Sequence, residues 1–267
     1  LNATLTDNNN GYTSLSSDIY SLYPFQMLVD GQGNRIYDYS STFSHYYSDQ
    51  MVNDYGYYQL GKNLLEEIDL ANNHTKETDF KVRLGADFKI MDGLSLSADY
   101  QYEKYQTTTR ELTDKNSYNG RHDIDWYATV DENQQLVYNV PDEDFLDQSQ
   151  TTASAWIFKL GANLNRSFGA DKEHYVNATA GFEMRSRHSM TDRWRRWGYN
   201  DQVLSWQPVD EATLDENGIT WWNGDRHYYS SSSYTDFSDV LNKEISYYLS
   251  AVYTYDNRYT LSASMRI

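Results

Sequence analysis

The residues of this 267-residue chain that could bind a ligand are concentrated between about 189 and 243. Aromatic rings can stack on the apolar faces of sugars, and arginine can hydrogen-bond hydroxyls and carboxylates. The side chains with which this stretch could bind a substrate or a partner are Trp194, Trp197, Trp206, Trp221, Trp222, Tyr228, Tyr229 and Arg226. The competing interpretation is that these aromatic residues only pack the long segment against its neighbours.

Two further groups of side chains could bind a cation or perform acid–base chemistry. The run from Pro141 to Asp147 carries four carboxylates, which suit calcium, but its spacing differs from that of an EF-hand loop. A solvated acidic loop is therefore the preferred interpretation. His122 lies beside Asp123 and Asp125, a combination that suits general acid–base catalysis. No nucleophile motif or glycine-rich phosphate loop accompanies it, and the histidines lack metal-ligand spacing, so we expect no enzyme, metal site or cofactor.

Composition narrows the class of protein. The chain has 39 acidic and 22 basic residues, for a net charge of -17, which argues against nucleic-acid binding. It has no cysteine, which excludes disulfides and thiolate sites. Mean hydropathy is low, at -0.82, although 16% of residues are aromatic. Many tyrosines with low mean hydropathy suit a β-barrel, because half of each strand faces a polar lumen.

Alternation of apolar and polar residues is the strongest structural signal. Between Asp79 and Ile90 every even position is apolar and every odd position is polar or glycine. A turn at 91–93 leads into a second alternating run, which predicts a hairpin at about 79–105. Two further hairpins are predicted at about 152–188 and 244–267. One face of these strands would be apolar, and the other would carry charges of both signs.

The connections are strongly unequal in length. Turns within hairpins are short, whereas the segments at about 7–78, 106–151 and 189–243 are long. Short periplasmic turns and long extracellular loops are typical of outer-membrane barrels, as is an aliphatic band flanked by aromatic residues. We therefore predict an all-β fold: about six antiparallel strands of a larger transmembrane β-barrel of about 22 strands. A soluble β-sandwich with an apolar core is the alternative.

Two stretches resemble a known family. Pro24 to Asn34 reads P-x-x-x-L-V-D-x-x-G-N, and Tyr253 to Arg266 reads Y-x-Y-x-x-R-Y-x-L-x-A-x-x-R. The turn from Ile90 to Leu94 contributes I-x-D-G-L. Together they look like the barrel of SusC/RagA-type TonB-dependent outer-membrane transporters of Bacteroidetes. On this resemblance, residues 1–267 are a partial barrel in the outer-membrane lipid.

The resemblance implies a function for the parent protein. It implies import of large nutrients, glycan or peptide, beneath a SusD-like surface lipoprotein lid. It also implies energy from the TonB-ExbB-ExbD complex, delivered through a plug domain that has no counterpart in these residues. Three alternatives stay open: a passive outer-membrane porin or adhesin barrel, an outer-membrane enzyme, and a soluble β-sandwich that binds glycans.

Overall fold

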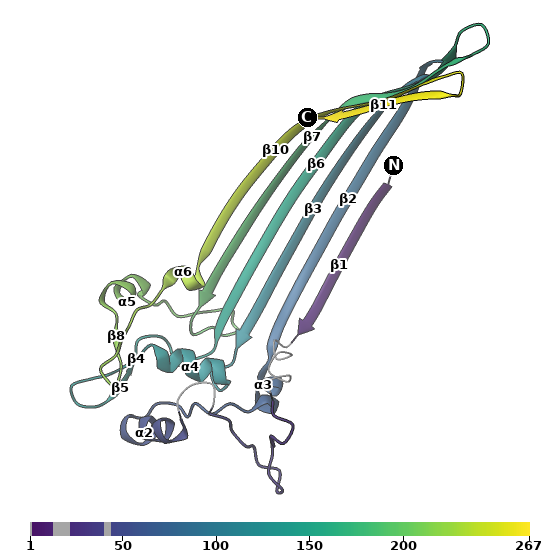
Figure 1. Ribbon diagram of the computed structural model, residues 1–267. Helices are drawn as coiled ribbons and strands as arrows, with labels where there is room; N and C mark the ends of the chain where they lie inside the picture. The colour runs from purple at the N-terminus through teal and green to yellow at the C-terminus, as the bar shows by residue number, and fades with distance from the viewer. Residues whose placement is uncertain (1, 13–21, 40–43) are drawn as a thin grey trace.

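The fold is dominated by one antiparallel sheet (Figure 1). The structure is a computed structural model that describes residues 2–12, 22–39 and 44–267. The seven strands, in their order across the sheet, are β1 (Asn2–Tyr12), β2 (Asn72–Met91), β3 (Leu94–Thr113), β6 (Phe145–Phe168), β7 (His174–Arg196), β10 (Asp236–Tyr255) and β11 (Tyr259–Arg266). The described strands form an open sheet with β1 and β11 at its edges. The prediction of a mostly antiparallel β fold is confirmed at this coarse level.

The strands are more numerous and longer than alternation predicts. A seventh strand, β1, lies partly within the segment expected to be a loop, because its asparagine-rich sequence carries little apolar alternation. The three hairpins span 72–113, 145–196 and 236–266 rather than about 79–105, 152–188 and 244–267. The added residues are mainly polar, and they pair through threonines, as in Thr75–Thr109 (3.2 Å) and Thr151–Thr191 (3.1 Å).

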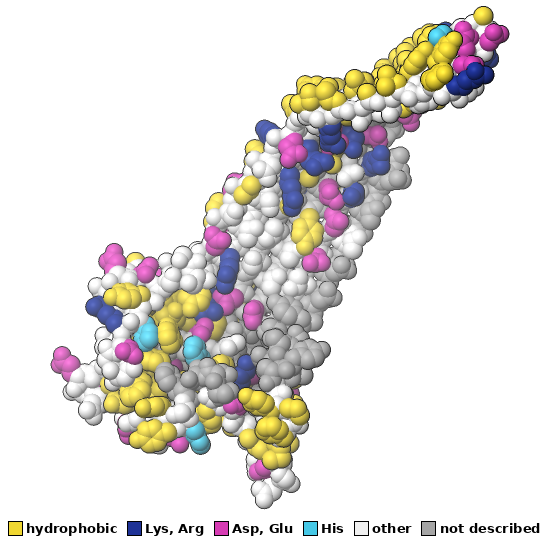
Figure 2. Space-filling view, viewed as in Figure 1, with side chains coloured by type: hydrophobic (Ala, Val, Ile, Leu, Met, Phe, Trp, Pro, Cys, Tyr) yellow, Lys and Arg dark blue, Asp and Glu magenta, His cyan; other side chains and the backbone are white. Residues whose placement is uncertain are grey.

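The apolar side chains form a continuous band on one face of the sheet, called here the apolar face. Ala86, Ala98 and Leu160 are direct cross-strand neighbours on β2, β3 and β6. Farther across the sheet, Ala180 pairs with Leu249. The band stays uncovered: Phe88 is 69% exposed and Leu261 is 73% exposed. Hydrophobic side chains are visible along the upper arm of the sheet in Figure 2.

The opposite, polar face is crossed by ion pairs between neighbouring strands. The side chains expected to share this face are Lys81, Arg83, Asp87, Lys89, Asp99, Glu103, Lys159, Glu183 and Arg185. Lys81 pairs with Glu103 (3.2 Å) and Arg83 with Asp99 (2.9 Å), which joins β2 to β3. Glu183, which is almost fully buried, lies within 3.0 Å of Lys159 and 3.5 Å of Arg266. Its single carboxylate therefore connects β6, β7 and β11.

Two glycines on the polar face make room for a tyrosine ring. Gly161 and Gly181 are cross-strand neighbours, and Tyr248 on β10 lies over both. A Cβ atom on Gly181 would collide with the Leu160 carbonyl oxygen and the Tyr248 hydroxyl. A Cβ on Gly161 would meet the same hydroxyl at 2.9 Å and the Ser97 hydroxyl at 3.1 Å, both side-chain atoms that have room to move.

We expect Gly181→Ala to destabilise the sheet by about 1–3 kcal/mol, because backbone as well as side chain must shift. Gly161→Ala is the matched control, and its cost should be smaller because only side chains obstruct it. Urea unfolding of the full-length protein, followed by tyrosine and tryptophan fluorescence, measures both. Equal effects of the two substitutions would contradict this account.

The long connections fold at one end of the sheet, opposite the short turns (Figure 1). Their helices are α2 (His45–Tyr55), α3 (Leu64–Leu70), α4 (Tyr118–Trp126), α5 (Glu211–Asn217) and α6 (Ser231–Tyr234). Two small hairpins accompany them: β4 (Ala128–Val130) with β5 (Leu136–Tyr138), and β8 (Ile219–Thr220) with β9 (Arg226–His227). In the described parts of the chain, no helix has the length and hydropathy needed to cross a membrane.

These connections share a hydrophobic core, and we call them together the loop assembly (residues 44–71, 114–144 and 197–235). One buried cluster is formed by Ile124, Tyr127, Val140, Phe145, Trp197, Ile219 and Tyr229. A second is formed by Met51, Tyr57, Leu60, Ala128 and Trp221. Each cluster draws on more than one connection, so burial of apolar surface orders segments that are far apart in sequence.

Candidate functional site

Asp125 is the polar centre of the loop assembly. Its side chain is fully buried in α4, where its Oδ2 accepts a hydrogen bond from the Tyr58 backbone N–H (2.9 Å). Its backbone carbonyl accepts one from the Trp221 indole N–H (3.0 Å). Its Oδ1 atom has no hydrogen-bond partner among the described residues. Asp125 thus links all three connections of the loop assembly through one residue.

Burial controls the protonation of this carboxyl. It raises the pKa of Asp125 from 3.8 to about 8, since the charged form loses its hydration. The Tyr58 N–H and Arg121 act in the opposite direction, and the nearby Asp142 carboxylate adds to the increase. At neutral pH the buried side chain is therefore mostly uncharged.

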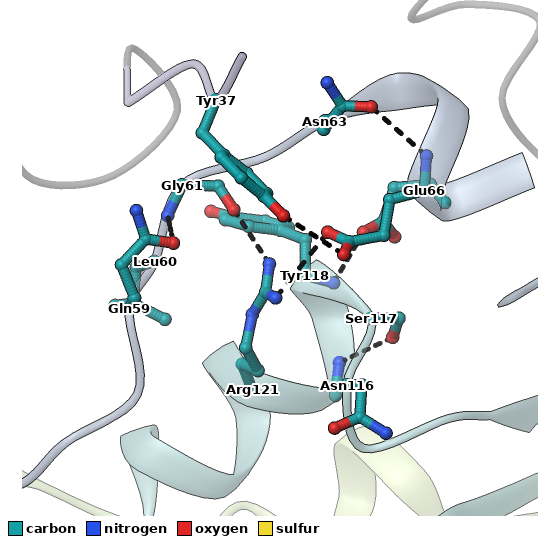
Figure 3. Close-up of polar contacts among 12 residues, drawn as sticks. Tyr37, Gln59, Leu60, Gly61, Asn63, Glu66, Asn116, Ser117, Tyr118 and Arg121 are labelled. Atoms are coloured by element: carbon teal, nitrogen blue, oxygen red, sulfur yellow. Dashed lines mark hydrogen bonds and ion pairs between the residues drawn. The ribbon is translucent and has the colours of Figure 1, made fainter. Parts of the chain in front are cut away.

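A second polar cluster fastens the projecting segment 22–39 to the start of α3, and α3 to α4 (Figure 3). Tyr37 donates its hydroxyl hydrogen to Glu66 (3.2 Å), and Arg121 donates to the Gly61 carbonyl (2.8 Å). Asn63 accepts hydrogen bonds from the first turn of α3, and its Nδ2 group donates to the carbonyls of Leu28 and Ile36, both at 2.7 Å. Asn63 therefore caps a helix and anchors the segment at the same time.

Arg195, at the end of β7, joins that strand to β6 and to α4. Its guanidinium makes a bidentate ion pair with Asp147 (2.9 and 2.7 Å) and a third hydrogen bond to Asp123 on α4 (2.7 Å). It also lies 4.2 Å from the ring centre of Phe145 and 4.1 Å from that of Tyr234. Burial alone would raise the pKa of Asp123, but the hydrogen bond from His122 and the Arg195 charge lower it below its usual value.

The eight aromatic and basic residues singled out in the sequence do not form one surface. Trp197, Trp221 and Tyr229 are buried in the two hydrophobic clusters, which agrees with the packing interpretation for these three. Trp194 and Trp222 are half-buried. Those that remain exposed are Trp206, Tyr228 and Arg226.

Trp194 and Trp206 meet around a residue outside that set. The Arg196 guanidinium carbon lies 4.1 Å from the Trp194 ring centre and 3.7 Å from that of Trp206. Beside them is a groove of about 350 Å³, whose lining includes Gln207 and Glu211. Arg196 was visible in the sequence only as one of several arginines in an aromatic stretch. Its special position depends on the turn that folds Trp206 back onto β7.

The acidic run and His122 have structural partners. Asp142 accepts a hydrogen bond from the Tyr58 hydroxyl (2.6 Å), and Asp144 accepts one from the Lys115 backbone N–H (2.9 Å). His122 contacts Asp123 (3.2 Å) and stacks with the Trp126 ring. In the described ranges, no three His, Cys, Asp or Glu residues are grouped so that they could hold a metal ion.

An exposed apolar surface lies elsewhere, on segment 22–39. Tyr23, Phe25 and Met27 are 66%, 82% and 67% exposed, and the first two rings stack at 5.6 Å. A groove of about 330 Å³ lies beside them. The sequence marked this segment only as a motif. Asn63 holds this segment at the end of the loop assembly that is far from the sheet, where these side chains remain exposed.

Comparisons with known proteins identify a fold but no family. No protein-family model matches the sequence, and no curated protein matches it. Among solved structures, the RagAB peptide transporter superposes with a TM-score of 0.55 at 14% identity, over 80% of this chain and 20% of that chain. The chain is similar in fold to part of RagAB.

Two other RagAB structures agree with this. The peptide importer in its "open-open" state gives a TM-score of 0.52 at 13% identity, over 80% of this chain and 20% of the other. The "closed-closed" state gives 0.55 at 12% identity, over 90% and 21%. This chain thus spans about one fifth of the RagAB chains that it resembles.

Proposed function

We propose that this chain forms part of the wall of a TonB-dependent outer-membrane transporter that imports large nutrients, glycan or peptide. The uninterrupted, uncovered apolar band on one face of a long antiparallel sheet carries the proposal. In a soluble β-sandwich that band would need a second sheet against it, and the described residues supply none. The fold similarity to RagAB supports the same reading.

The dimensions of the band suit a membrane. The apolar residues of β2 run from Phe80 to Ile90. Ten residues rise about 33 Å along a strand. At a tilt of about 40° this corresponds to roughly 25 Å along the membrane normal, the height of the lipid-facing band in outer-membrane barrels. The short turns would then face the periplasm and the loop assembly the exterior.

The partners in this proposal are a SusD-like lipoprotein lid and the TonB-ExbB-ExbD complex. The exposed Tyr23, Phe25 and Met27 at the outer end of the loop assembly provide an apolar surface for such a lid. Energy coupling would pass through a plug domain, which lies outside these residues. The sequence candidates that remain accessible to a substrate or partner are Trp194, Trp206, Trp222, Tyr228 and Arg226. The buried candidates would pack beneath this surface and stabilise it: Trp197, Trp221 and Tyr229.

A density map of the intact protein in detergent or lipid tests the proposal. We expect the sheet to continue into a closed barrel of about 22 strands that surrounds a plug. A closed barrel without a plug would instead indicate a passive porin or adhesin. A water-soluble sandwich with the apolar band inside would contradict the membrane assignment altogether.

Substitution on the two faces of β3 gives a second test. Ala98 lies in the middle of the apolar face, and its neighbour Ser97 lies on the polar face, opposite Asp87. We expect Ala98→Lys to destabilise the bilayer-inserted protein by about 2–4 kcal/mol, because a charge then faces lipid. Ser97→Lys should change stability little, because the new charge lies opposite a carboxylate. Urea unfolding in liposomes measures both, and similar costs for the two variants would argue against a lipid-facing band.

A further inference from the structure

The Arg196 side chain is held in place without using its hydrogen-bonding capacity. The indoles of Trp194 and Trp206 stack on its guanidinium group, at 4.1 and 3.7 Å from their ring centres. Among the described residues, its guanidinium N–H groups have no hydrogen-bond or ion-pair partner. Neighbouring Arg195, by contrast, is paired with two carboxylates. Arg196 is therefore a fixed cation whose N–H edges are free of partners in the described part of the chain.

We call Arg196 together with Trp194 and Trp206 the clamp, and the surrounding backbone holds it in a defined shape. The Gln207 N–H donates to the Trp197 carbonyl (2.9 Å). This hydrogen bond holds the chain that follows Trp206 against the end of β7. Arg110 of β3 donates to the Tyr199 hydroxyl (3.0 Å) and to Asp201 (3.3 Å), which fastens the intervening turn to the sheet. The clamp is thus anchored to β7 and β3, and it is preorganised before a ligand binds.

The groove beside the clamp is large enough for a sugar unit. Its volume is about 350 Å³, and its lining combines Trp194, Trp206 and Pro208 with the polar Gln207. Glu211 also lines it, but this carboxylate accepts a hydrogen bond from the Tyr229 hydroxyl (3.2 Å). Indole and proline surfaces suit the C–H faces of a saccharide ring, and the amide suits its hydroxyls.

The free edges of a stacked guanidinium suit an oxyanion. Its N–H groups form a planar fork that matches carboxylate or phosphate oxygens in a bidentate manner. Contact with two indoles reduces the entropy cost of ordering the side chain when a ligand binds. We propose that the groove at Arg196, Trp194 and Trp206 binds an acidic saccharide, that is, a sugar carrying a carboxylate or phosphate group.

Such a sugar could come from solution or from a membrane glycolipid, and the position of the groove allows both. Trp194 and Arg196 have the same strand parity as the apolar face, and the β6–β7 register is unbroken from that band to the end of β7. In the proposed barrel the groove would lie on the outer surface, above the lipid-facing band. An acidic glycan in solution or the sugar headgroup of an anionic outer-leaflet glycolipid could therefore reach it. The arm of the test with a soluble sugar does not depend on the proposed transport function.

Intrinsic fluorescence of the intact protein in detergent tests the site directly, because two tryptophans form it. Titration with a trigalacturonate should change the emission with saturation, whereas its methyl ester should bind about tenfold more weakly or not detectably, because the charge-assisted hydrogen bonds are lost. The ester comparison needs no protein variant. A parallel arm uses lipid nanodiscs with and without a phosphorylated glycolipid, where added glycolipid should shift the same emission.

Variants at Arg196 provide the second comparison. Arg196→Lys keeps the charge but loses the planar fork, and Arg196→Ala loses both. We expect acidic-sugar affinity to fall in the order wild type, Lys, Ala, with a loss of about tenfold or more for Ala. Arg187→Lys, on the same strand but the opposite face, is the matched control and should change affinity less than twofold.

Dependence on Arg196 in either arm supports the site and identifies the source of the sugar. The proposal is overturned if the acid and its methyl ester bind alike and glycolipid leaves the emission unchanged. It is equally overturned if the Arg196 variants, folded as judged by circular dichroism, bind both probes as the wild type does. Arg196 would then serve only to hold two indoles together. Either result is independent of whether the parent protein transports nutrients.

Discussion

Replacement of Asp125 by asparagine should stabilise the loop assembly at neutral pH and flatten its pH dependence. The buried carboxyl has a pKa of about 8 in the folded protein and 3.8 when exposed. Folding at pH 7 therefore requires uptake of a proton, at a cost of up to about 4 kcal/mol. Asparagine is neutral, has nearly the same shape and keeps an acceptor for the Tyr58 N–H. It removes that cost.

The direction of the pH effect follows from the raised pKa. The stability that the protonated carboxyl contributes is fully present below pH 3.8 and is lost as pH rises towards about 8. Through that window the loop assembly should lose about 1.4 kcal/mol per pH unit. Hydrogen-exchange protection of the α4 amides in the intact protein, corrected for intrinsic exchange rates, measures this slope. Asp215→Asn, at an exposed position on α5, is the control and should keep the wild-type slope. An unchanged slope in Asp125→Asn would show that the Asp125 carboxyl does not cause the pH dependence.

Arg195→Met should have the largest destabilising effect in the loop assembly, about 3–5 kcal/mol. The substitution removes a cation that is ion-paired with both Asp147 and Asp123, and it leaves two largely buried carboxylates without it. Because Asp123 belongs to α4 and Asp147 to β6, we expect α4 to lose protection from hydrogen exchange first. Loss of protection in α4 should precede any change in the strands.

Charge-neutral variants separate the buried charges from the packing. Combining Arg195→Met with Asp123→Asn and Asp147→Asn removes all three charges, and it should recover part of the lost stability. Arg187→Met, at an exposed position on the same strand, should change little. If the triple variant is no more stable than Arg195→Met, the aromatic contacts of the guanidinium with Phe145 and Tyr234 account for most of the effect.

The sheet was predictable from the sequence to the extent that its residues alternate. The hairpin turn at 91–93 was expected from its glycine, and Gly93 indeed has φ of 84°. The strand ends were missed because Thr107, Thr108 and Thr109 are compatible with a strand without marking either face as apolar. The strand β1 was missed because its asparagine-rich sequence carries little apolar alternation. Pairing with a longer neighbour, not local pattern, extends these strands.

The loop assembly could not be derived from periodicity, because its order comes from contacts between distant segments. Trp221 meets Tyr57 and Ala128 in one cluster, and no spacing in the sequence signals that meeting. Aromatic content marks residues 189–243 as unusual, but it does not separate buried Trp197 from exposed Trp206. The anchoring role of Arg195 depends on Asp123, which is 72 residues away. The free edges of Arg196 likewise become apparent only when both indoles are in place.

The two shared hydrophobic clusters have a consequence for engineering and for evolution. Because segments from three connections complete one core around Asp125, none of the three is an independent module. A chimaera that exchanges only residues 197–235 with those of another protein would bring new side chains against an unchanged α4, and would be expected to misfold at this end. Diversification of the exposed surface of the loop assembly should therefore proceed by coordinated replacement of all three connections. Single substitutions at exposed positions such as Trp206 and Tyr228, which lie outside the two clusters, offer a second route.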